Sequence, residues 1–145
     1  MRFMVIVKAT PESEKEGALP DPQLLLEMGK FNEELMKAGV LLAMDGLHPS
    51  SKGARVKFSG KSRTVVDGPF TEAKELVAGF WLWRVKSLEE AIEWVKRCPN
   101  CSAGESEIEI RQVREMEDFA PILSEEQIQH KIKGRAQLPN QTANK

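Results

Sequence analysis

The chain has little cysteine, no surplus of either charge and no long apolar run, and each absence excludes a class of protein. Two cysteines are too few to staple a domain of 145 residues, which favours a reducing, cytoplasmic location. The 21 basic and 22 acidic residues leave a formal net charge of -1, which argues against a nucleic-acid binder that neutralises phosphates. No apolar run approaches the ~20 residues needed to cross a bilayer, so no membrane association is expected.

The first residues, Met1–Lys8, contain an apolar stretch too short for a signal peptide and lack a small-residue cleavage site. They predict a first strand instead. With 41% hydrophobic and 30% charged residues, the chain has the composition of a folded protein rather than a disordered one. Its length allows a single core that buries roughly two-thirds of the unfolded surface. Composition therefore predicts a soluble α+β domain and names no substrate.

Periodicity and capping signals predict an alternation of strands and helices. Asp21-Pro22 opens a helix because Asp accepts hydrogen bonds at the N-cap and Pro fits the first helical position. Ser87 and Glu90 form a capping box that begins a second helix. In chain order we predict a strand over Arg2–Ala9, a helix over Asp21–Ala38, a strand over Val40–Leu47, a hairpin of Lys52–Ser59 and Ser62–Asp67, a strand over Val77–Val85, a helix from Ser87 that Pro99 ends, and a strand over Glu105–Val113.

With the hairpin set aside, this order is β-α-β-β-α-β, the ferredoxin-like arrangement with both helices on one sheet face. The predicted fold class is therefore α+β, ferredoxin-like with an inserted hairpin. We place this domain over residues 1–116. An extension over residues 117–145 is predicted to hold a short helix over Ser124–Lys133 and then a polar, mobile tail over Gly134–Lys145.

The strand over Val77–Val85 is apolar on both faces, with Trp81 and Trp83 on one side and Phe80 and Leu82 on the other. One layer of helices covers only one sheet face, and an open face carrying tryptophan would form an adhesive patch. We expect a second copy to pack sheet to sheet, with Trp81 or Trp83 at or near the interface, which gives a closed homodimer. The alternative is that the C-terminal segment folds across this face.

The most informative stretch is Asp67-Gly68-Pro69-Phe70-Thr71-Glu72-Ala73-Lys74-Glu75. Asp-Gly-Pro is a turn signal, but a turn does not require Phe70 or the acids that follow. The stretch gathers the carboxylates of Asp67, Glu72 and Glu75 near one strand end. The alternative interpretation is a solvated turn.

A histidine follows another predicted strand, in Gly46-Leu47-His48-Pro49-Ser50. A histidine at a strand end can serve as a general base or proton shuttle, although a lone loop histidine is more often just exposed. We expect His130, in the weak C-terminal helix, to be solvated.

The sequence Cys98-Pro99-Asn100-Cys101 is a C-x-x-C motif. It follows a predicted helix, and the dipole at a helix C-terminus opposes a thiolate. No second such motif completes a zinc site, and the two histidines lack zinc-finger spacing. We expect two reduced thiols without metal, with redox or metal chemistry as the lesser alternative. No cofactor motif is present.

These stretches resemble the DGPF-containing branch of the YCII-related proteins. The resemblance covers about Arg2 to Val113, and the sequence departs from the pattern at Gln112, where proline is expected. It rests on residues 67–75, Gly79-Phe80, Glu90-Ala91 and Arg97-Cys98-Pro99, and extends back to residues 46–50 and forward to Glu109-Ile110-Arg111.

The resemblance implies a dimeric α+β barrel of ferredoxin-like subunits, in a family whose activity is largely unassigned. Some members are encoded beside, or fused to, extracytoplasmic-function sigma factors, which implies a functional link to such a factor here. YCII relatives carry a His/Asp pair in a cleft, proposed as catalytic. By this resemblance His48 and Asp67 are the candidate pair in this chain.

Two functions fit these observations. The first is a small-molecule enzyme, or enzyme-like protein, in which His48 is the acid–base group and Asp67 orients or charges it. The second is a non-enzymatic ligand-binding or regulatory module in which the acidic turn is a docking surface or clamp. An enclosed cavity holding His48 and Asp67 within hydrogen-bond reach favours the enzyme, and a filled interior favours the module. The expected substrate-binding side chains are Glu72, Glu75, Trp81, Trp83 and Arg111, the last of which would hold an anionic group.

Overall fold

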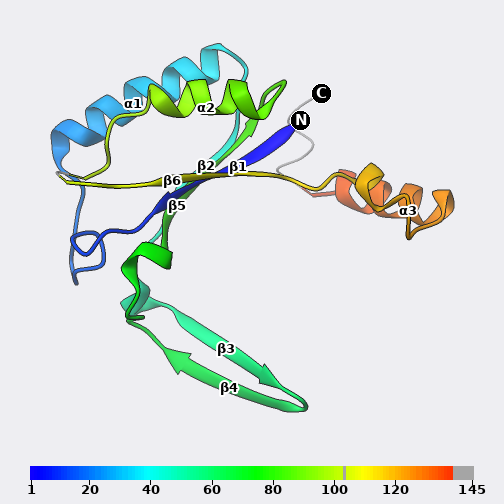
Figure 1. Ribbon diagram of the computed structural model, residues 1–145, viewed down its shortest axis with the longest axis horizontal. Coiled ribbons are helices and arrows are strands. Elements are labelled where there is room, and N and C mark those ends of the chain that lie inside the picture. The colour runs from blue at the N-terminus through cyan, green and yellow to red at the C-terminus, as the bar shows by residue number, and fades with distance from the viewer. Residues whose placement is uncertain (103, 139–145) are drawn as a thin grey trace. The chain divides into compact units, whose positions relative to one another are not determined.

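The computed structural model describes residues 1–102 and 104–138, and the chain divides into two compact units, Met1–Gln112 and Val113–Lys145. The first unit combines a four-stranded antiparallel sheet, two α-helices and a separate two-stranded hairpin (Figure 1). Its elements are β1 (Arg2–Lys8), α1 (Pro22–Lys37), β2 (Leu41–Gly46), β3 (Ala54–Ser59), β4 (Ser62–Asp67), β5 (Val77–Arg84), α2 (Leu88–Lys96) and β6 (Ile108–Gln112), with short 3-10 turns η1 (Ser50–Lys52) and η2 (Ala73–Glu75).

The strand order in the sheet is β2-β5-β1-β6, and every neighbouring pair is antiparallel. Both α1 and α2 lie over the same face of this sheet (Figure 1). The β3–β4 hairpin pairs only with itself and stands apart from the sheet. This architecture is consistent with a ferredoxin-like α+β fold, so the predicted α+β class is confirmed.

Both helices of the first unit begin at the predicted capping residues. Asp21 Oδ1 accepts a hydrogen bond from the backbone N–H of Gln23 at 2.7 Å. Ser87 Oγ accepts one from the N–H of Glu90 at 3.1 Å, while the Glu90 carboxylate accepts from the N–H of Lys86 at 2.7 Å. The bonds from Gln23 and Glu90 satisfy N–H groups that a helix leaves unpaired in its first turn, whereas Lys86 precedes the N-cap, so the predicted capping box at Ser87 forms only in part. Local sequence therefore determines where both helices start.

An aromatic cluster between the sheet and the helices forms the centre of the core. The ring of Phe31 on α1 meets the rings of Trp81, Trp83 and Trp94 edge-on, at centroid distances of 5.9, 6.2 and 6.5 Å. Trp81 is 4% exposed and Trp83 0%. Edge-to-face contacts of this kind add to the stabilisation from area burial.

The expectation that Trp81 or Trp83 lies at a sheet-to-sheet interface is therefore wrong. Both side chains point toward the helices, because Phe31 supplies the aromatic surface against which they pack. Alternation along β5 sends Phe80 and Leu82 to the opposite face of the sheet, which α1 and α2 leave uncovered. β5 is apolar on both faces, as predicted. The residues on the face away from the helices are Phe80 and Leu82, however, and not Trp81 and Trp83.

The uncovered sheet face has an apolar centre and a charged margin. On β1 and β5, Met4 pairs with Leu82 and Ile6 pairs with Phe80. On the β6 side, Arg111 lies opposite Met4 and Glu109 lies opposite Ile6. Glu109 forms ion pairs with Lys8 at 3.7 Å and with Arg111 at 3.4 Å.

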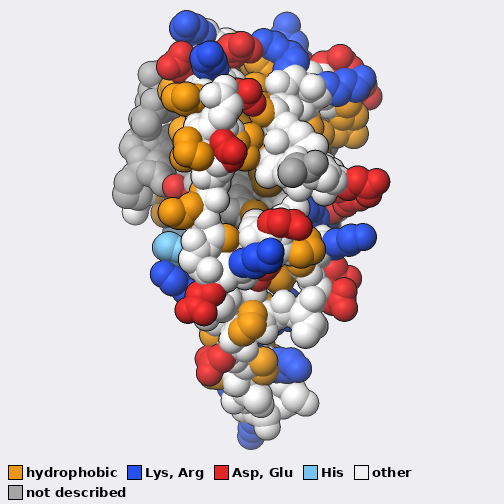
Figure 2. Space-filling view, turned by 90° about the vertical axis from the view of Figure 1, so that its left-hand side faces the viewer, with side chains coloured by type: hydrophobic (Ala, Val, Ile, Leu, Met, Phe, Trp, Pro, Cys, Tyr) orange, Lys and Arg blue, Asp and Glu red, His pale blue; other side chains and the backbone are white. Residues whose placement is uncertain are grey.

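The β3–β4 hairpin also carries apolar side chains in solvent. Val56, Phe58 and Val65 are 50%, 71% and 64% exposed. Figure 2 shows hydrophobic side chains at the surface of the narrow lower end of the molecule, which the hairpin forms. An isolated two-stranded hairpin is marginally stable in water, so its base must be held by other segments.

The second unit contains a short 3-10 turn η3 (Met116–Phe119) and the helix α3 (Glu125–Ala136). Ser124 and Gln127 form a reciprocal capping box at the start of α3. The helix continues to Ala136, beyond the predicted end at Lys133, so the segment expected to be a mobile tail begins as helix. Its last residues, 139–145, lie outside the described part of the chain. Within residues 1–102 and 104–138, no helix is long and apolar enough to span a membrane.

The two core tryptophans differ in hydrogen bonding, which gives a direct test of the core. Trp81 Nε1–H donates to Asn32 Oδ1 at 2.8 Å, whereas the buried Nε1 of Trp83 has no hydrogen-bond partner among residues 1–102 and 104–138. A double-mutant cycle of Trp81→Phe with Asn32→Ala should give a coupling free energy of about 1 kcal/mol in urea unfolding. The matched cycle of Trp83→Phe with Asn32→Ala should give a coupling near zero. Equal couplings in the two cycles would contradict this core.

Candidate functional site

The DGPF turn, residues 67–70, docks onto the segment that follows β2. The N–H of Gly68 donates to the Gly53 carbonyl oxygen at 3.0 Å. The N–H of Phe70 donates to Ser50 Oγ at 3.0 Å. The end of the β3–β4 hairpin is therefore fixed to the connection between β2 and β3.

Position 68 requires glycine because the backbone there lies very close to the backbone of Ser50. A Cβ atom at this position would lie 1.7 Å from the Ser50 carbonyl oxygen and 2.5 Å from its carbon. Those atoms belong to the backbone and cannot move aside as a flexible side chain would. The second residue of the DGPF turn must therefore lack a side chain for the turn to sit where it does.

Ser50 also binds a third segment, the loop between β1 and α1. Its N–H lies 3.2 Å from each carboxylate oxygen of Glu14, and its Oγ–H donates to Glu14 Oε2 at 2.5 Å. The same hydroxyl oxygen accepts the bond from Phe70. One serine side chain thus joins three segments that are far apart in the sequence, and bonds to a carboxylate are among the stronger hydrogen bonds in proteins.

A pocket of about 380 Å³ opens beside this junction. The guanidinium carbon of Arg55 lies 3.8 Å from the centroid of the Phe70 ring, a cation–π contact that holds both side chains in the wall. The polar lining comes from Glu14, His48, Ser50, Lys52 and Arg55, and the apolar lining from Leu47, Pro49, Phe70, Leu76 and Val77, with Gly53 between them.

The pocket has more positive than negative side chains. Its one carboxylate, Glu14, is bound to Ser50. Within residues 1–102 and 104–138, neither Lys52 nor Arg55 forms an ion pair, and no hydrogen bond or ion pair engages the imidazole of His48, which is exposed. The arrangement suits a small anion, which could bind two cationic groups beside a free imidazole.

Of the predicted pair, only His48 lines the pocket. Asp67 is exposed at the end of β4, and among the described residues no hydrogen bond or ion pair joins the two side chains. The docked turn brings the end of the hairpin to Ser50, two positions after His48, and leaves Asp67 outside the pocket lining.

The other predicted binding residues are dispersed. Glu72 and Glu75 are exposed at η2, where the N–H of Glu75 donates to the Glu72 carbonyl at 3.0 Å. Arg111 is exposed on β6 in its ion pair with Glu109. Trp81 and Trp83 are buried against the helices, so the expectation that they wall a substrate cleft is replaced by a role in the core.

Of the residues that line the pocket, only His48 was predicted as a site residue, and the charged side chains of Glu14, Lys52 and Arg55 were missed. The Glu14–Ser50 bond spans 36 positions, so no local spacing signals it. The stacking of Arg55 on Phe70 likewise depends on the docked hairpin.

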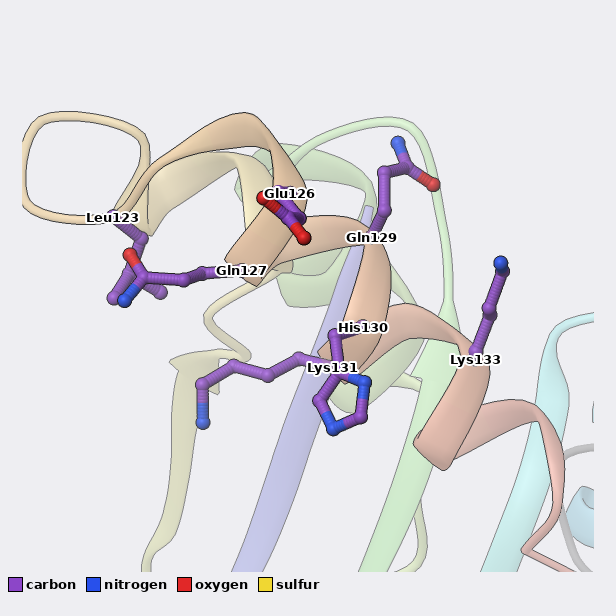
Figure 3. Close-up of a pocket in the computed structure, with 7 residues that line it drawn as sticks. All are labelled: Leu123, Glu126, Gln127, Gln129, His130, Lys131 and Lys133. Carbon is purple, nitrogen blue, oxygen red and sulfur yellow. The ribbon is translucent and has the colours of Figure 1, made fainter.

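A second hollow, of about 500 Å³, lies along α3 in the other unit. Its lining residues fall within positions 123–133, so one helix and its N-terminal flank supply them all. Figure 3 shows Gln129 and Lys133 pointing away from Leu123 and Gln127, so the side chains do not converge on one point. His130 lies here and is exposed, as predicted. We therefore interpret this hollow as the side of a single helix and not as a binding site.

Metal ligation finds no support in the part of the chain that the structure describes. Among those residues, no group of three or more His, Cys, Asp or Glu side chains lies close enough to hold a metal ion.

The chain was also compared with known families. A family model for the YCII-related domain matches residues 1–117, which include the whole pocket and the DGPF turn. The chain belongs to the YCII-related family. An uncharacterised protein of Rhizobium meliloti (strain 1021) is 29% identical over 91 residues, which is 63% of this chain and 73% of that protein. Membership of the YCII-related family confirms the resemblance of the sequence motifs and leaves the reaction to be inferred from the site.

The close approach at Gly68 can be tested by paired glycine substitutions. Gly68→Ala should lower the free energy of unfolding by about 1–3 kcal/mol, because its new methyl group meets the Ser50 backbone. Gly53→Ala is the control: its Cβ would lie 3.5 Å from the same oxygen, an ordinary contact, and its φ of -111° suits any residue. Urea unfolding of both variants measures the difference, and equal stabilities would contradict the docked turn.

Proposed function

We propose that this YCII-related protein is a small-molecule enzyme, or enzyme-like protein, that binds an organic anion in the pocket beside the DGPF turn. His48 is its acid–base group. The observation that carries the proposal is the convergence of His48, Lys52 and Arg55 on one pocket, with the pocket's one carboxylate already bound to Ser50.

Each group in the pocket has a distinct task. Arg55 and Lys52 bind the carboxylate or phosphate of the substrate, and the stacking on Phe70 orients the planar guanidinium. The apolar wall, including Leu47 and Leu76, accepts the carbon skeleton. His48 then donates or accepts a proton at the exposed mouth, which suits isomerisation, elimination or hydrolysis. Asp67 ends β4 and begins the turn that brings Phe70 into the pocket wall.

We further propose that the protein forms a homodimer, a dimeric α+β barrel, through the uncovered sheet face. Met4, Ile6, Phe80 and Leu82 give this face an apolar centre, and burying such a centre against a second copy is favourable at ~25 cal/mol/Å². A two-fold axis places the same surface on both partners. Arg111, on the margin of this face, then faces the partner sheet.

A ligand-sensing module is the second candidate function. The observation that favours it is that His48 lines the pocket without Asp67, so the pocket lacks the paired acid and base of the implied catalytic site. In this case the anion is bound and not converted. A link to sigma-factor-dependent transcription, which the family resemblance implies, would then give the bound ligand its effect.

The anion site is tested by a matched pair of lysine variants. A panel of small carboxylates and phosphates, screened by thermal shift, should raise the melting temperature of the wild type. Lys52→Gln should weaken the Kd of the best ligand roughly tenfold or more, because it removes a charge-assisted bond. Lys61→Gln makes the same charge change at the hairpin turn and should leave the Kd unchanged. Equal effects of the two variants would indicate nonspecific attraction by net charge.

His48→Gln separates the two candidate functions. For an enzyme, this variant should keep ligand affinity within a few-fold and lose on the order of 100-fold or more in turnover, because glutamine cannot exchange the proton. For a sensing module, the wild type itself should leave the ligand chemically unchanged, which product analysis by mass spectrometry would show.

Two single variants, each replacing a methionine with lysine, test the dimer. Met4→Lys places a charge on the uncovered sheet face, where Met4 is 38% exposed. We expect it to convert a dimer to a monomer in light scattering. Met36→Lys, on α1 where Met36 is 55% exposed, is the control and should stay dimeric. A wild-type monomer at micromolar concentration would contradict the proposed dimer.

A further inference from the structure

Two cysteine side chains lie together in the connection between α2 and β6. Cys98 and Cys101 are both free thiols and both partly exposed. Cys98 also packs against the edge of the core. The proposed anion pocket does not include either residue.

The local backbone brings the two sulfur atoms toward one point. Cys98 Sγ lies 3.4 Å from the Pro99 carbonyl oxygen, and Cys101 Sγ lies 3.7 Å from the same atom. Both sulfurs therefore lie beside a single backbone oxygen before any reaction takes place.

The side chain of Asn100 braces the loop that carries this pair. Its Nδ2 donates to the Gly104 carbonyl at 3.0 Å, and its Oδ1 accepts from the N–H of Ser102 at 3.1 Å and from Ser106 Oγ at 2.6 Å. The approach of the two thiols is thus set by a hydrogen-bonded turn and not only by their spacing in the sequence.

The two thiols differ in pKa, so Cys101 is the nucleophile and Cys98 keeps its proton. The hydrogen bond from Cys98 lowers the pKa of Cys101 to about 7, against the opposing effect of burial. The same interaction, together with burial, raises the pKa of the Cys98 thiol. The dipole of α2 was expected to disfavour a thiolate here, whereas the interaction with Cys98 favours one at Cys101.

We propose that Cys98 and Cys101 form a redox-active dithiol that low-molecular-weight disulfides oxidise to an intramolecular disulfide. In the first step the Cys101 thiolate attacks a disulfide RSSR, which forms a mixed disulfide and releases RS⁻. In the second step Cys98 loses its proton to solvent and its sulfur attacks Cys101 Sγ, which forms the internal disulfide and releases a second RS⁻. The chain loses two electrons and RSSR gains them. This function is independent of the anion pocket.

Exposure of the native protein to glutathione disulfide tests the pathway. After an acid quench, mass spectrometry of the wild type should show the loss of two hydrogens and no lasting adduct. Cys98→Ser should accumulate a glutathione adduct on Cys101, because the resolving thiol is gone. Cys101→Ser should react much more slowly than Cys98→Ser. A wild type that keeps two free thiols, under conditions where the urea-unfolded chain reacts, would overturn the proposal.

Alkylation rates test the role of the hydrogen bond. Cys98→Ser keeps a donor beside Cys101, whereas Cys98→Ala removes it. With a pKa of 9.0 in place of about 7, the thiolate fraction at pH 7 falls about 50-fold while nucleophilicity rises about 8-fold. The native Cys98→Ala variant should therefore react with iodoacetamide about sixfold more slowly than Cys98→Ser. In urea the two variants should react at the same rate. Equal rates in the native state would overturn the assignment of Cys101 as the activated thiol.

Discussion

The packing of Phe31 against Trp81 and Trp83 determines which face of the sheet the helices cover. Because side chains alternate along β5, the burial of these two tryptophans leaves Phe80 and Leu82 on the other face. The same contact thus builds the core and creates the apolar surface through which we expect a second copy to bind. Trp83 is completely buried and its Nε1 has no hydrogen-bond partner in the described part of the chain, so the cluster is held by shape and area more than by polar bonds.

The candidate site depends on a second constraint, the contact of the DGPF turn with Ser50. The absence of a Cβ at Gly68 allows the two backbones to meet, and the Ser50 hydroxyl then joins the turn to Glu14. This junction anchors the base of a hairpin that has no other strand to pair with. In the part of the chain that the structure describes, Lys52 and Arg55 form no ion pair, and this is the electrostatic basis of the proposed anion site.

Local signals in the sequence were sufficient for the elements and their order. Asp21 and Ser87 cap the helices because their hydrogen bonds reach only two or three residues along the chain. The orientation of β5 was not predictable from its own residues, since Trp81 and Trp83 on one side and Phe80 and Leu82 on the other are equally apolar. The outcome depended on Phe31, which lies 50 positions before Trp81.

The sequence identified residues of the candidate site only where they lie in short, recognisable motifs. The DGPF turn and His48 were identified, and the pocket does form beside them. No hydrogen bond or ion pair joins His48 to Asp67 among the described residues, although the docked turn brings the segments that follow β2 and β4 together at Ser50. Lys52 and Arg55 were not identified from the sequence. Arg55 lines the pocket because the hairpin is docked, and Lys52 does so because it lies in the 3-10 turn that begins at Ser50.

The most direct test of the central claim, an anion site built by the DGPF turn, is amide chemical-shift mapping. Two-dimensional ¹H–¹⁵N spectra would be recorded while a small carboxylate or phosphate that shifts the melting temperature is added. The account predicts saturable shifts concentrated in residues 48–55 and at Gly68 and Phe70. Shifts concentrated instead in residues 123–133 along α3, with those of the DGPF turn unmoved, would contradict it.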